Sequence, residues 1–323
     1  MSLQEACKAL DIMRDNGVRT LIFSGGEPLL YEHIWDVLSY ASDLGFTMNM
    51  MTNGTLLDSD AAEALGSFDI PVWISLDYYS EKAQRAWRRG GSFRNIFRFI
   101  ESHLREVMNV GIRSTVFWNN IGDIKNIASF CARNNIPYVA RPVINCKMNV
   151  VWRRPSQVDL RDLYAMFKDY RDRGHDFIFD DPPYYLYKDS SLDDVFVAQE
   201  SRVCEAHYHR ISVDPRGNVF PCPFLHTRSL MYGNLFRDEW SSIVERHELF
   251  RENLAYNACG DHCWFMRQPF PESDTRFRLV RGCHGSCIAE SYWRYAREHN
   301  RRLSIEELTL LPLYDTSCPY YDA

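Results

Sequence analysis

The first 150 residues alternate short runs of β-forming residues with amphipathic segments of helical period, and this alternation constrains the fold more than any other feature. Amphipathic segments span residues 31–44, 93–108 and 124–134. Strand–helix–strand repetition requires parallel strands joined by right-handed crossovers. We therefore expect an α/β sheet or open barrel with strands at residues 20–24, 47–51, 72–76, 112–117 and 138–143.

The composition of the chain changes twice after this region. Residues 151–200 contain a helical pattern at 159–173 and then Pro182-Pro183, which a regular helix excludes. From residue 201 the sequence is rich in Cys, His, Gly and aromatic residues, with helical patterns that are short apart from 286–301. We expect three parts: a partial barrel at 1–150, a bridging segment at 151–200 and a small irregular domain at 201–323.

The first residues have the form of a helix N-terminus. Ser2 precedes Glu5 with the spacing of a capping box, and Ala6, Leu10 and Met13 then form an apolar stripe. A helix in a β/α fold follows a strand. We expect that the fold either starts one strand late or lacks a piece upstream of this helix.

Charge and hydropathy exclude several classes of protein. The formal net charge of −6 and the pI near 5.9 argue against a nucleic-acid-binding protein. We expect no membrane span, because no run of 18 apolar residues occurs, and no signal segment. The default expectation is a cytoplasmic protein.

Two glycines, a carboxylate and a proline directly follow the first β-rich run, as Gly25-Gly26-Glu27-Pro28. Glycine permits a sharp turn and a close approach to a ligand. Ligands of α/β proteins bind at the carboxyl ends of parallel strands. Glu27 and nearby carbonyl groups suit an ammonium group. The alternative interpretation is a tight strand-to-helix turn without a ligand.

These four residues and the strand ends that follow resemble those of the radical S-adenosylmethionine (SAM) enzymes. Landmarks of that family follow in order: Met51-Thr52-Asn53-Gly54-Thr55, Ile74-Ser75-Leu76-Asp77, Arg89-Gly90 before Ser92-Phe93, and Phe117-Trp118-Asn119. The resemblance covers residues 1–150 and implies an incomplete (β/α)6 partial barrel of strands 2 to 6. It implies that Gly25, Gly26 and Glu27 hold the methionyl amino group of SAM and that Ser75 and Asp77 face the ribose or substrate. Pro28 and Asn53 complete the implied cofactor-binding set.

One mark of that family does not occur in this sequence. Family members carry a Cys-x3-Cys-x2-Cys loop before the glycine turn, and its thiolates bind the [4Fe–4S] cluster that chelates SAM. Only 24 residues precede Gly25 here, and they contain one cysteine, Cys7. We interpret Cys7, Cys131 and Cys146 as structural. We expect a third [4Fe–4S] cluster only if the missing N-terminal segment is supplied.

Seven of the ten cysteines lie after residue 200. Two pairs have Cys-x3-Cys spacing, which lets two thiolates reach one metal centre, and thiolates are the standard ligands of iron–sulfur clusters. Pro215-Arg216-Gly217-Asn218 predicts a hairpin that brings together the chain near Cys204 and Cys222. Zinc, with histidines completing the ligand set, and disulfides remain alternatives. The candidate ligands are Cys204, Cys222, Cys259, Cys263, Cys283, Cys287 and Cys318.

The spacing of Cys204, Gly217 and Cys222 resembles the opening of the SPASM domain, which carries auxiliary [4Fe–4S] clusters in many radical SAM enzymes. The resemblance implies two auxiliary clusters. By position, Cys204, Cys222 and Cys287 would serve the nearer cluster. The remaining four would serve the farther one, although the nineteen residues between Cys263 and Cys283 depart from the family spacing.

These features support an enzyme hypothesis and two alternatives. The resemblance implies a radical SAM/SPASM oxidoreductase that oxidises or crosslinks a peptide or protein substrate, with a reductant such as flavodoxin or ferredoxin, incomplete as given. The first alternative is a non-catalytic iron–sulfur binding or electron-transfer subunit, with a partner chain covering the exposed edge at residues 21–23. The second is a zinc-bound structural protein.

Overall fold

The computed structural model describes residues 1–87, 93, 96–97, 109–144, 148, 152–180, 210–255 and 285–308, with only the backbone at 157, 254–255 and 285–291. The chain divides into two compact units. Unit 1 contains residues 1–143 and 153–180, and unit 2 contains residues 144–152 and 181–323.

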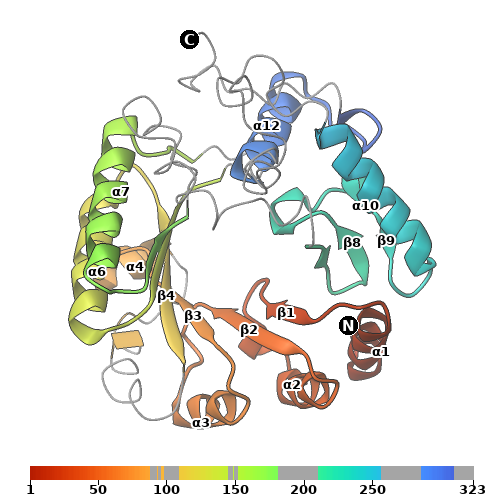
Figure 1. Ribbon diagram of the computed structural model, residues 1–323, viewed down its shortest axis with the longest axis horizontal. Helices are drawn as coiled ribbons and strands as arrows, with labels where there is room; N and C mark the ends of the chain where they lie inside the picture. The colour runs from red at the N-terminus through yellow and green to blue at the C-terminus, as the bar shows by residue number, and fades with distance from the viewer. Residues whose placement is uncertain are drawn as a thin grey trace, which may run out of the picture. The chain divides into compact units, whose positions relative to one another are not determined.

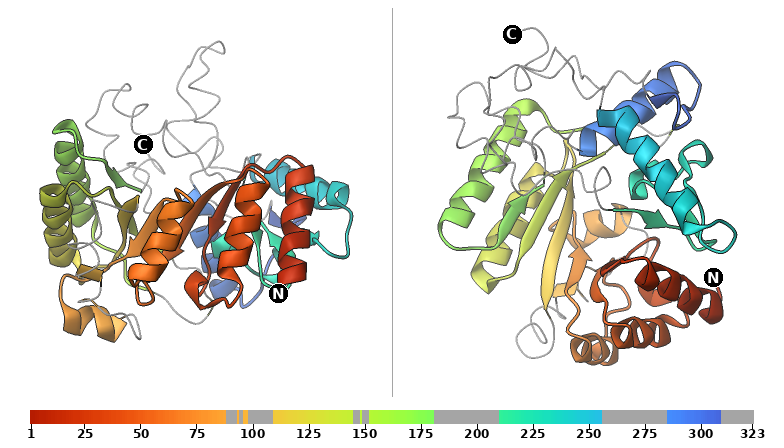
Figure 2. Two further views of the ribbon diagram at one scale, coloured as in Figure 1. Left: turned by 90° about the horizontal axis from the view of Figure 1, so that it is seen from below. Right: turned by 45° about the vertical axis from the view of Figure 1, so that its right-hand side comes forward.

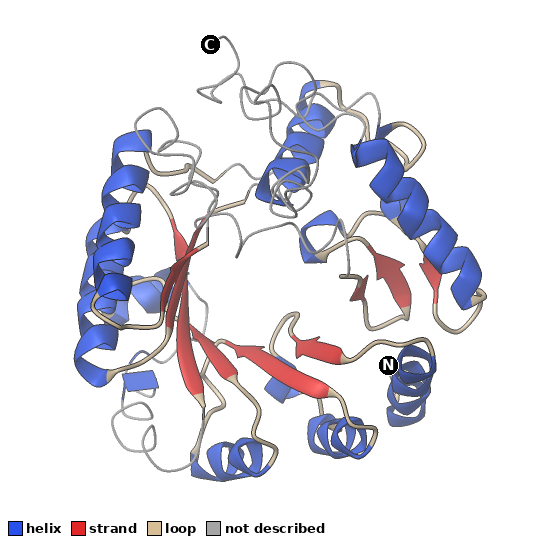
Figure 3. Ribbon diagram, viewed as in Figure 1, coloured by secondary structure: helices blue, strands red, loops and turns tan. Residues whose placement is uncertain are grey.

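Unit 1 is built on one parallel sheet whose six strands lie in chain order. Each strand pairs in parallel with the next, so each connection is a crossover (Figures 1 and 3). The expected α/β architecture is therefore confirmed. The strands are β1 (Thr20–Phe23), β2 (Thr47–Thr52), β3 (Val72–Ser75), β4 (Val110–Val116), β5 (Tyr138–Pro142) and β6 (Phe177–Phe179).

Helices line one face of this sheet (Figures 1 and 2). The alternation of the strands explains the arrangement, since Met48, Met50 and Thr52 of β2 are buried whereas Asn49 and Met51 are half-buried. The helices of unit 1 are α1 (Leu3–Asp15), the short η1 (Pro28–Leu30), α2 (Ile34–Asp43), α3 (Ser59–Ser67), α4 (Glu81–Trp87), α6 (Ile121–Asn134) and α7 (Gln157–Asp172). The segment expected to be helical at 93–108 lies mostly outside the described residues.

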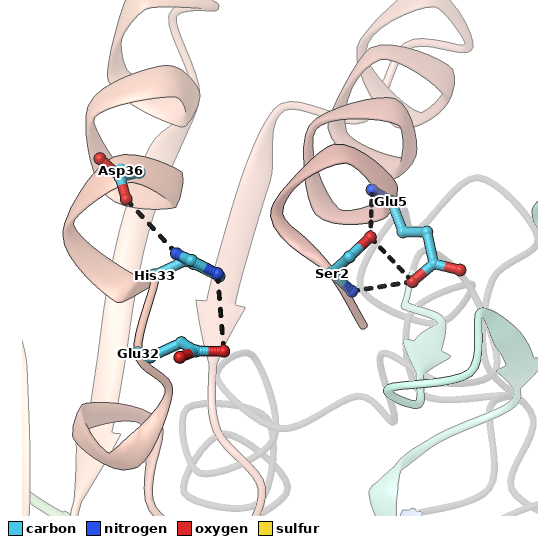
Figure 4. Close-up of polar contacts among 5 residues, drawn as sticks. All are labelled: Ser2, Glu5, Glu32, His33 and Asp36. Carbon is cyan, nitrogen blue, oxygen red and sulfur yellow. Dashed lines mark hydrogen bonds and ion pairs between the residues drawn. The ribbon is translucent and has the colours of Figure 1, made fainter.

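Helix α1 begins with the expected capping box. The backbone N–H of Glu5 donates to Ser2 Oγ at 3.3 Å, and the N–H of Ser2 donates to Glu5 Oε2 at 2.8 Å (Figure 4). The hydrogen bond from the Ser2 N–H and a second one from the Ser2 hydroxyl lower the pKa of the Glu5 carboxyl group. Figure 4 also shows His33, the residue that precedes α2, between the carboxylates of Glu32 and Asp36.

Residues 151–200 are not a simple bridge, contrary to our expectation. They supply α7 and β6, which belong to unit 1, and β6 extends the sheet beyond the five strands that we expected. Aromatic packing explains this placement: the Phe167 ring of α7 lies 5.1 Å from the Tyr138 ring and 5.4 Å from the Phe179 ring, between centroids. Residues 181–200 lie outside the described part of the chain.

Unit 2 contains the predicted hairpin. Strands β7 (Ser212–Val213) and β8 (Asn218–Phe220) pair antiparallel, and β9 (Gly233–Asn234) adds to β8. The turn is fixed by Asp214 Oδ1, which accepts from the backbone N–H groups of Arg216 at 2.8 Å and Asn218 at 3.0 Å.

Two long helices complete the described part of unit 2: α10 (Trp240–Ala255) and α12 (Gly285–Glu298). Helix α12 was expected, whereas α10 corrects the expectation that only short helices precede residue 286. Among the residues of α10 whose side chains are described, few are buried, so the helix has only a sparse apolar pattern in the sequence. Ile243 and Phe250 are buried, and the intervening His247 Nδ1 lies 3.3 Å from Tyr232 Oη.

No helix in the described ranges combines the length and the apolar character that crossing a membrane would need.

Candidate functional site

The glycine turn lies where β1 ends. Gly25 has φ of +127°, a conformation that side chains disfavour, and Glu27 is the N-cap of η1, with Pro28 at its first position. Glu27 Oε1 accepts from the backbone N–H of Leu29 at 3.3 Å. The glycines therefore allow the backbone to turn sharply after β1, and the Glu27 carboxylate caps the short helix that follows.

The Glu27 carboxylate also joins the ends of two strands. Thr52 Oγ1 donates to Glu27 Oε1 at 2.7 Å, and the backbone N–H of Asn53 donates to Oε2 at 2.7 Å. The N–H of Gly54 in turn donates to Thr52 Oγ1 at 3.0 Å. The structure thus brings the predicted residues Glu27 and Asn53 into direct contact. Thr52, the neighbour of Asn53 in the Met-Thr-Asn-Gly-Thr run, adds a second hydrogen bond to Glu27.

This arrangement changes what Glu27 can offer to a ligand. Each carboxylate oxygen already accepts at least one hydrogen bond from the chain, and each has two lone pairs. An ammonium group at this turn would therefore share the carboxylate with Thr52 and Asn53, or would bind backbone carbonyl groups at the glycines. That Glu27 binds an ammonium group remains a prediction.

Ser75 and Asp77 follow at the end of β3. Asp77 is fully buried, and its Oδ1 accepts from the backbone N–H of Thr115 on β4 at 2.7 Å. The side-chain oxygen of Gln84 accepts from the N–H of Asp77 at 3.1 Å, and Gln84 Nε2 donates to the carbonyl of Ser75 at 3.3 Å. The chain itself therefore holds the Asp77 carboxylate, while Ser75 is half-buried.

Two buried amides that sequence reasoning missed hold these strand ends: Gln84 and Asn120, both fully buried. Asn120 Nδ2 donates to the carbonyl groups of Asp77 and Thr115, each at 2.9 Å, and Asn120 Oδ1 accepts from Phe117 N at 2.7 Å. For Asn120 the available signal was its place as the residue before α6, whereas Gln84 lies inside α4 and has no local signal.

Cys131 behaves as the structural residue that we expected. It is buried on α6, and burial raises the pKa of its thiol far above the usual range. Such a thiol remains protonated, and metal ligation requires the thiolate. Cys7 is half-buried on α1.

Of the seven candidate cluster ligands, Cys222 is fully described. It is buried and lies two residues after the end of β8, as the N-cap of η3 (Pro223–Leu225). Cys287 lies on α12, where only the backbone is described. The other predicted ligands, Cys204, Cys259, Cys263, Cys283 and Cys318, and also Cys146, lie outside the described residues. Within the described ranges, no three His, Cys, Asp or Glu side chains gather as a metal site.

One hydrogen bond connects the Cys222 turn to the helix that carries Cys287. Trp293 Nε1 of α12 donates to the carbonyl of Phe224 at 2.8 Å, and Trp293 is buried. Cys287 precedes Trp293 by six residues, or about 9 Å along a helix. The fold of unit 2 is therefore compatible with one cluster that uses both cysteines.

Comparison with known proteins agrees with this architecture. Residues 1–131 match the model of the radical SAM superfamily. The chain is 24% identical, over 84% of its length and 59% of the relative, to the antilisterial bacteriocin subtilosin biosynthesis protein AlbA of Bacillus subtilis. It is 26% identical, over 78% of its length and 64% of the relative, to the mycofactocin maturase MftC of Mycolicibacterium smegmatis. The chain thus spans less than two thirds of both curated relatives.

A solved structure shares the fold. Streptococcus suis SuiB, crystallised with the precursor peptide SuiA, superimposes with a TM-score of 0.64 at 18% identity, covering 98% of this chain and 69% of SuiB. The parallel sheet with helices on one face is therefore the partial barrel seen in that protein. Residues 1–131, which contain strands β1 to β4 of the sheet, are thus similar to the radical SAM superfamily.

Proposed function

We propose that this chain belongs to a peptide-modifying radical SAM oxidoreductase that oxidises or crosslinks side chains of a peptide or protein. The Glu27 carboxylate, which joins the ends of β1 and β2 at the ligand-binding edge of a parallel sheet, is the observation that carries this proposal. The name of AlbA describes biosynthesis of the bacteriocin subtilosin, the name of MftC describes maturation of mycofactocin, and SuiB was crystallised with a precursor peptide.

In this proposal the SAM site is formed by Gly25, Gly26, Glu27, Pro28, Asn53, Ser75 and Asp77. The backbone of Gly25 and Gly26 holds the methionyl amino group, and Glu27 fixes that backbone relative to Asn53. SAM held at these residues would supply radical chemistry, that is, removal of a hydrogen atom from the substrate, once a reduced iron–sulfur cluster is also provided. Because Asp77 Oδ1 accepts from Thr115 N, the role of Asp77 is to orient the end of β3.

The seven C-terminal cysteines would bind two auxiliary [4Fe–4S] clusters of a SPASM domain. Cys204, Cys222 and Cys287 would serve one cluster, and Cys259, Cys263, Cys283 and Cys318 the other. The hydrogen bond from Trp293 to the Cys222 turn supports the first grouping. Such clusters and a reductant such as flavodoxin or ferredoxin suit the reducing cytoplasm.

The cluster that activates SAM requires a Cys-x3-Cys-x2-Cys loop, which residues 1–323 do not contain. The outer edge of β1 is a place where a strand with this loop could pair. Within the described residues β1 pairs with β2 alone, and Ile22 is 38% exposed. A partner chain or a preceding segment would cover this edge. The same edge supports a second candidate function, a non-catalytic iron–sulfur subunit.

Binding of SAM to the anaerobically reconstituted chain tests the proposal. We expect Glu27→Gln to weaken binding at least about tenfold, because an amide group cannot accept at both oxygen positions. The matched control is Glu63→Gln, at an exposed position of α3. Equal affinities in a folded Glu27→Gln variant would refute the assigned site, and 5′-deoxyadenosine formation by the isolated chain would refute the non-catalytic alternative.

Iron and sulfide analysis tests the auxiliary clusters separately. Cys222→Ser is expected to lose one cluster, about four iron atoms per chain, whereas Cys131→Ala retains the full iron content. Zinc in place of iron and sulfide in the anaerobically purified chain would contradict the iron–sulfur assignment.

A further inference from the structure

Two loops at the carboxyl edge of the sheet bring an exposed tryptophan and an exposed arginine together. Trp118 lies in the loop between β4 and α6, and Arg153 lies in the loop between β5 and α7. The backbone N–H of Trp118 donates to the carbonyl of Arg153 at 3.3 Å, so the two loops are joined directly. Ligands of α/β proteins bind at the loops that follow parallel strands. Both residues therefore lie on the edge of the sheet that carries the Glu27 turn.

The Trp118 ring is exposed although its loop is firmly held. Its side chain is 51% exposed, whereas tryptophan is highly buried on average. The preceding backbone N–H, that of Phe117, donates to the buried Asn120 Oδ1 at 2.7 Å, and the N–H of Trp118 itself is bound to the Arg153 loop. Hydrogen bonds of the backbone thus hold an open aromatic surface in place at this edge.

The guanidinium group of Arg153 lies over this ring, with its Cζ 4.6 Å from the ring centroid. Among the residues that the structure describes, no carboxylate forms an ion pair with the Arg153 side chain. A cation–π contact depends on the positive charge and the ring quadrupole, so it leaves N–H donors of the guanidinium fork for another ligand. The contact therefore positions a cation that can still bind an anion.

We propose that Arg153 and Trp118 bind a carboxylate group of the substrate, either an acidic side chain or the C-terminal carboxylate of a peptide. The inference rests on the proposed peptide-modifying function. The Arg153 fork matches the two oxygens of a carboxylate, and its single positive charge balances a monoanion. Trp118 restricts the rotamers of Arg153 before the ligand arrives and offers its ring to the apolar groups beside the carboxylate. Tryptophan and arginine are also enriched among the residues that dominate the affinity of interfaces.

Fluorescence anisotropy with three labelled model peptides of otherwise identical sequence tests this inference. One peptide has an internal Glu and an amidated C-terminus, the second an internal Gln and a free C-terminus, and the third an internal Gln and an amidated C-terminus. The full chain is expected to bind one of the two anionic peptides at least about tenfold more tightly than the neutral peptide. The preferred peptide identifies the source of the carboxylate.

Variants then assign the preference to the pair. Arg153→Gln is expected to abolish it, whereas Arg153→Lys retains part of it, because lysine keeps the charge without the fork. Trp118→Ala is expected to reduce the preference about threefold, the effect of one exposed cation–π contact. Adding Trp118→Ala to Arg153→Gln is expected to cause no further loss of preference, since Trp118 acts on the carboxylate through Arg153. The matched controls, Arg19→Gln at the exposed residue before β1 and Trp35→Ala on α2, retain the preference.

Equal affinity for the three peptides, no measurable binding of any of them, or a preference that survives in Arg153→Gln would overturn the inference. Thermal unfolding verifies that each variant is folded. SAM binding, measured in parallel, separates the inference from the proposed function, and Arg153→Gln and Trp118→Ala are expected to bind SAM within about twofold of the unmodified chain. If Arg153→Gln loses SAM together with the preference, the pair belongs to the SAM site, and the inference fails while the proposed function stands. A preference that depends on Arg153 in a chain that binds no SAM would support the carboxylate site and refute the SAM-dependent function.

Discussion

The carboxylate of Glu27, at the end of β1, accepts a hydrogen bond from the backbone N–H of Asn53, at the end of β2, with 2.7 Å between Oε2 and N. This bond continues the pairing of the two strands beyond their last register pair, Phe23 with Met50. A side chain therefore sets the separation of two turns that the strands alone would leave less constrained. The same hydrogen bond constrains the position of the adjacent turn at Gly25 and Gly26.

Thr52→Val tests how much the Glu27 connection stabilises unit 1. The substitution keeps the β-branched shape of a buried side chain but removes the hydroxyl that donates to Glu27 and accepts from Gly54 N. We expect the free energy of unfolding to fall by about 1–3 kcal/mol. Urea denaturation measures it, with Thr47→Val at the exposed start of β2 as the control. Identical losses in both variants would contradict the prediction.

Gly54→Ala tests the packing beneath the second turn. Gly54 has φ of +75°, and an added Cβ would lie 2.9 Å from Ile96 Cγ1 and 3.0 Å from Ile74 Cγ2. Backbone strain and crowding are expected to cost about 2–3 kcal/mol of unfolding free energy. The control is Gly122→Ala on α6, where an added Cβ meets open space and is expected to be neutral or mildly stabilising. An unchanged free energy of unfolding in Gly54→Ala would contradict this prediction, because it would mean that Ile96 moves aside without cost.

Asn120→Ala tests the buried amide that joins the β3 and β4 ends. The substitution leaves the carbonyl groups of Asp77 and Thr115 and the N–H of Phe117 without this partner. We expect a loss of about 2–4 kcal/mol. Asn134→Ala, at an exposed position near the end of α6, is expected to change stability by less than about 0.5 kcal/mol. Differential scanning calorimetry compares the two variants, and similar shifts would argue against the network.

His226 links the stability of unit 2 to pH. Partial desolvation lowers the pKa of its imidazole, although nearby Asp214 raises it, and Ser212 Oγ lies 2.8 Å from Nε2. The unfolded chain therefore takes up the proton first, so stability falls as pH drops through about 6.5. His226→Gln is expected to show a smaller fall between about pH 7.5 and about pH 5.5. Urea unfolding midpoints at the two pH values measure this fall in stability. An equal fall in the unmodified chain and in His226→Gln would disprove the prediction.

Trp293→Phe tests the connection between α12 and the Cys222 turn. Phenylalanine keeps much of the buried ring but removes the N–H that donates to Phe224. If Cys222 and Cys287 bind one cluster, iron release to a chelator is expected to accelerate about fivefold to tenfold, as one net hydrogen bond is lost. The control is Trp35→Phe on α2, whose side chain is 37% exposed. Equal iron-release rates in the two variants would show that this hydrogen bond does not affect the stability of the clusters.

The sequence predicted those elements that are determined by residues close together in the chain. The five expected strands occur within about two residues of their positions, and so do the capping box at Ser2 and the hairpin around Gly217. Each follows from neighbouring residues: alternation for β2, the Ser-x-x-Glu spacing for α1, and a glycine with φ of +80° at the turn. Glycines and a carboxylate after a strand also indicated the turn at Glu27.

Elements defined by distant partners were not predicted. Strand β6 has only three residues, and it is recognisable once Phe177 and Phe179 pack against Phe167 and Tyr138. Gln84 and Asp180 are ordinary polar residues in the sequence, and they acquire roles only when the fold brings Asp77 and Arg113 to them. Pairings of this kind depend on the register of the sheet, which the sequence pattern leaves open.

The strand order of unit 1 has a consequence for how the protein is made. Because each strand pairs with the strand that precedes it in the chain, every β/α unit finds its template already synthesised when it leaves the ribosome. Sheet growth can proceed in the direction of translation, with loop closures no longer than one crossover. A ribosomal pause after β3 would leave a sheet fragment with the Glu27 connection already formed, whereas the ion pairs of Asp180 with Arg113 and Arg141 would form last.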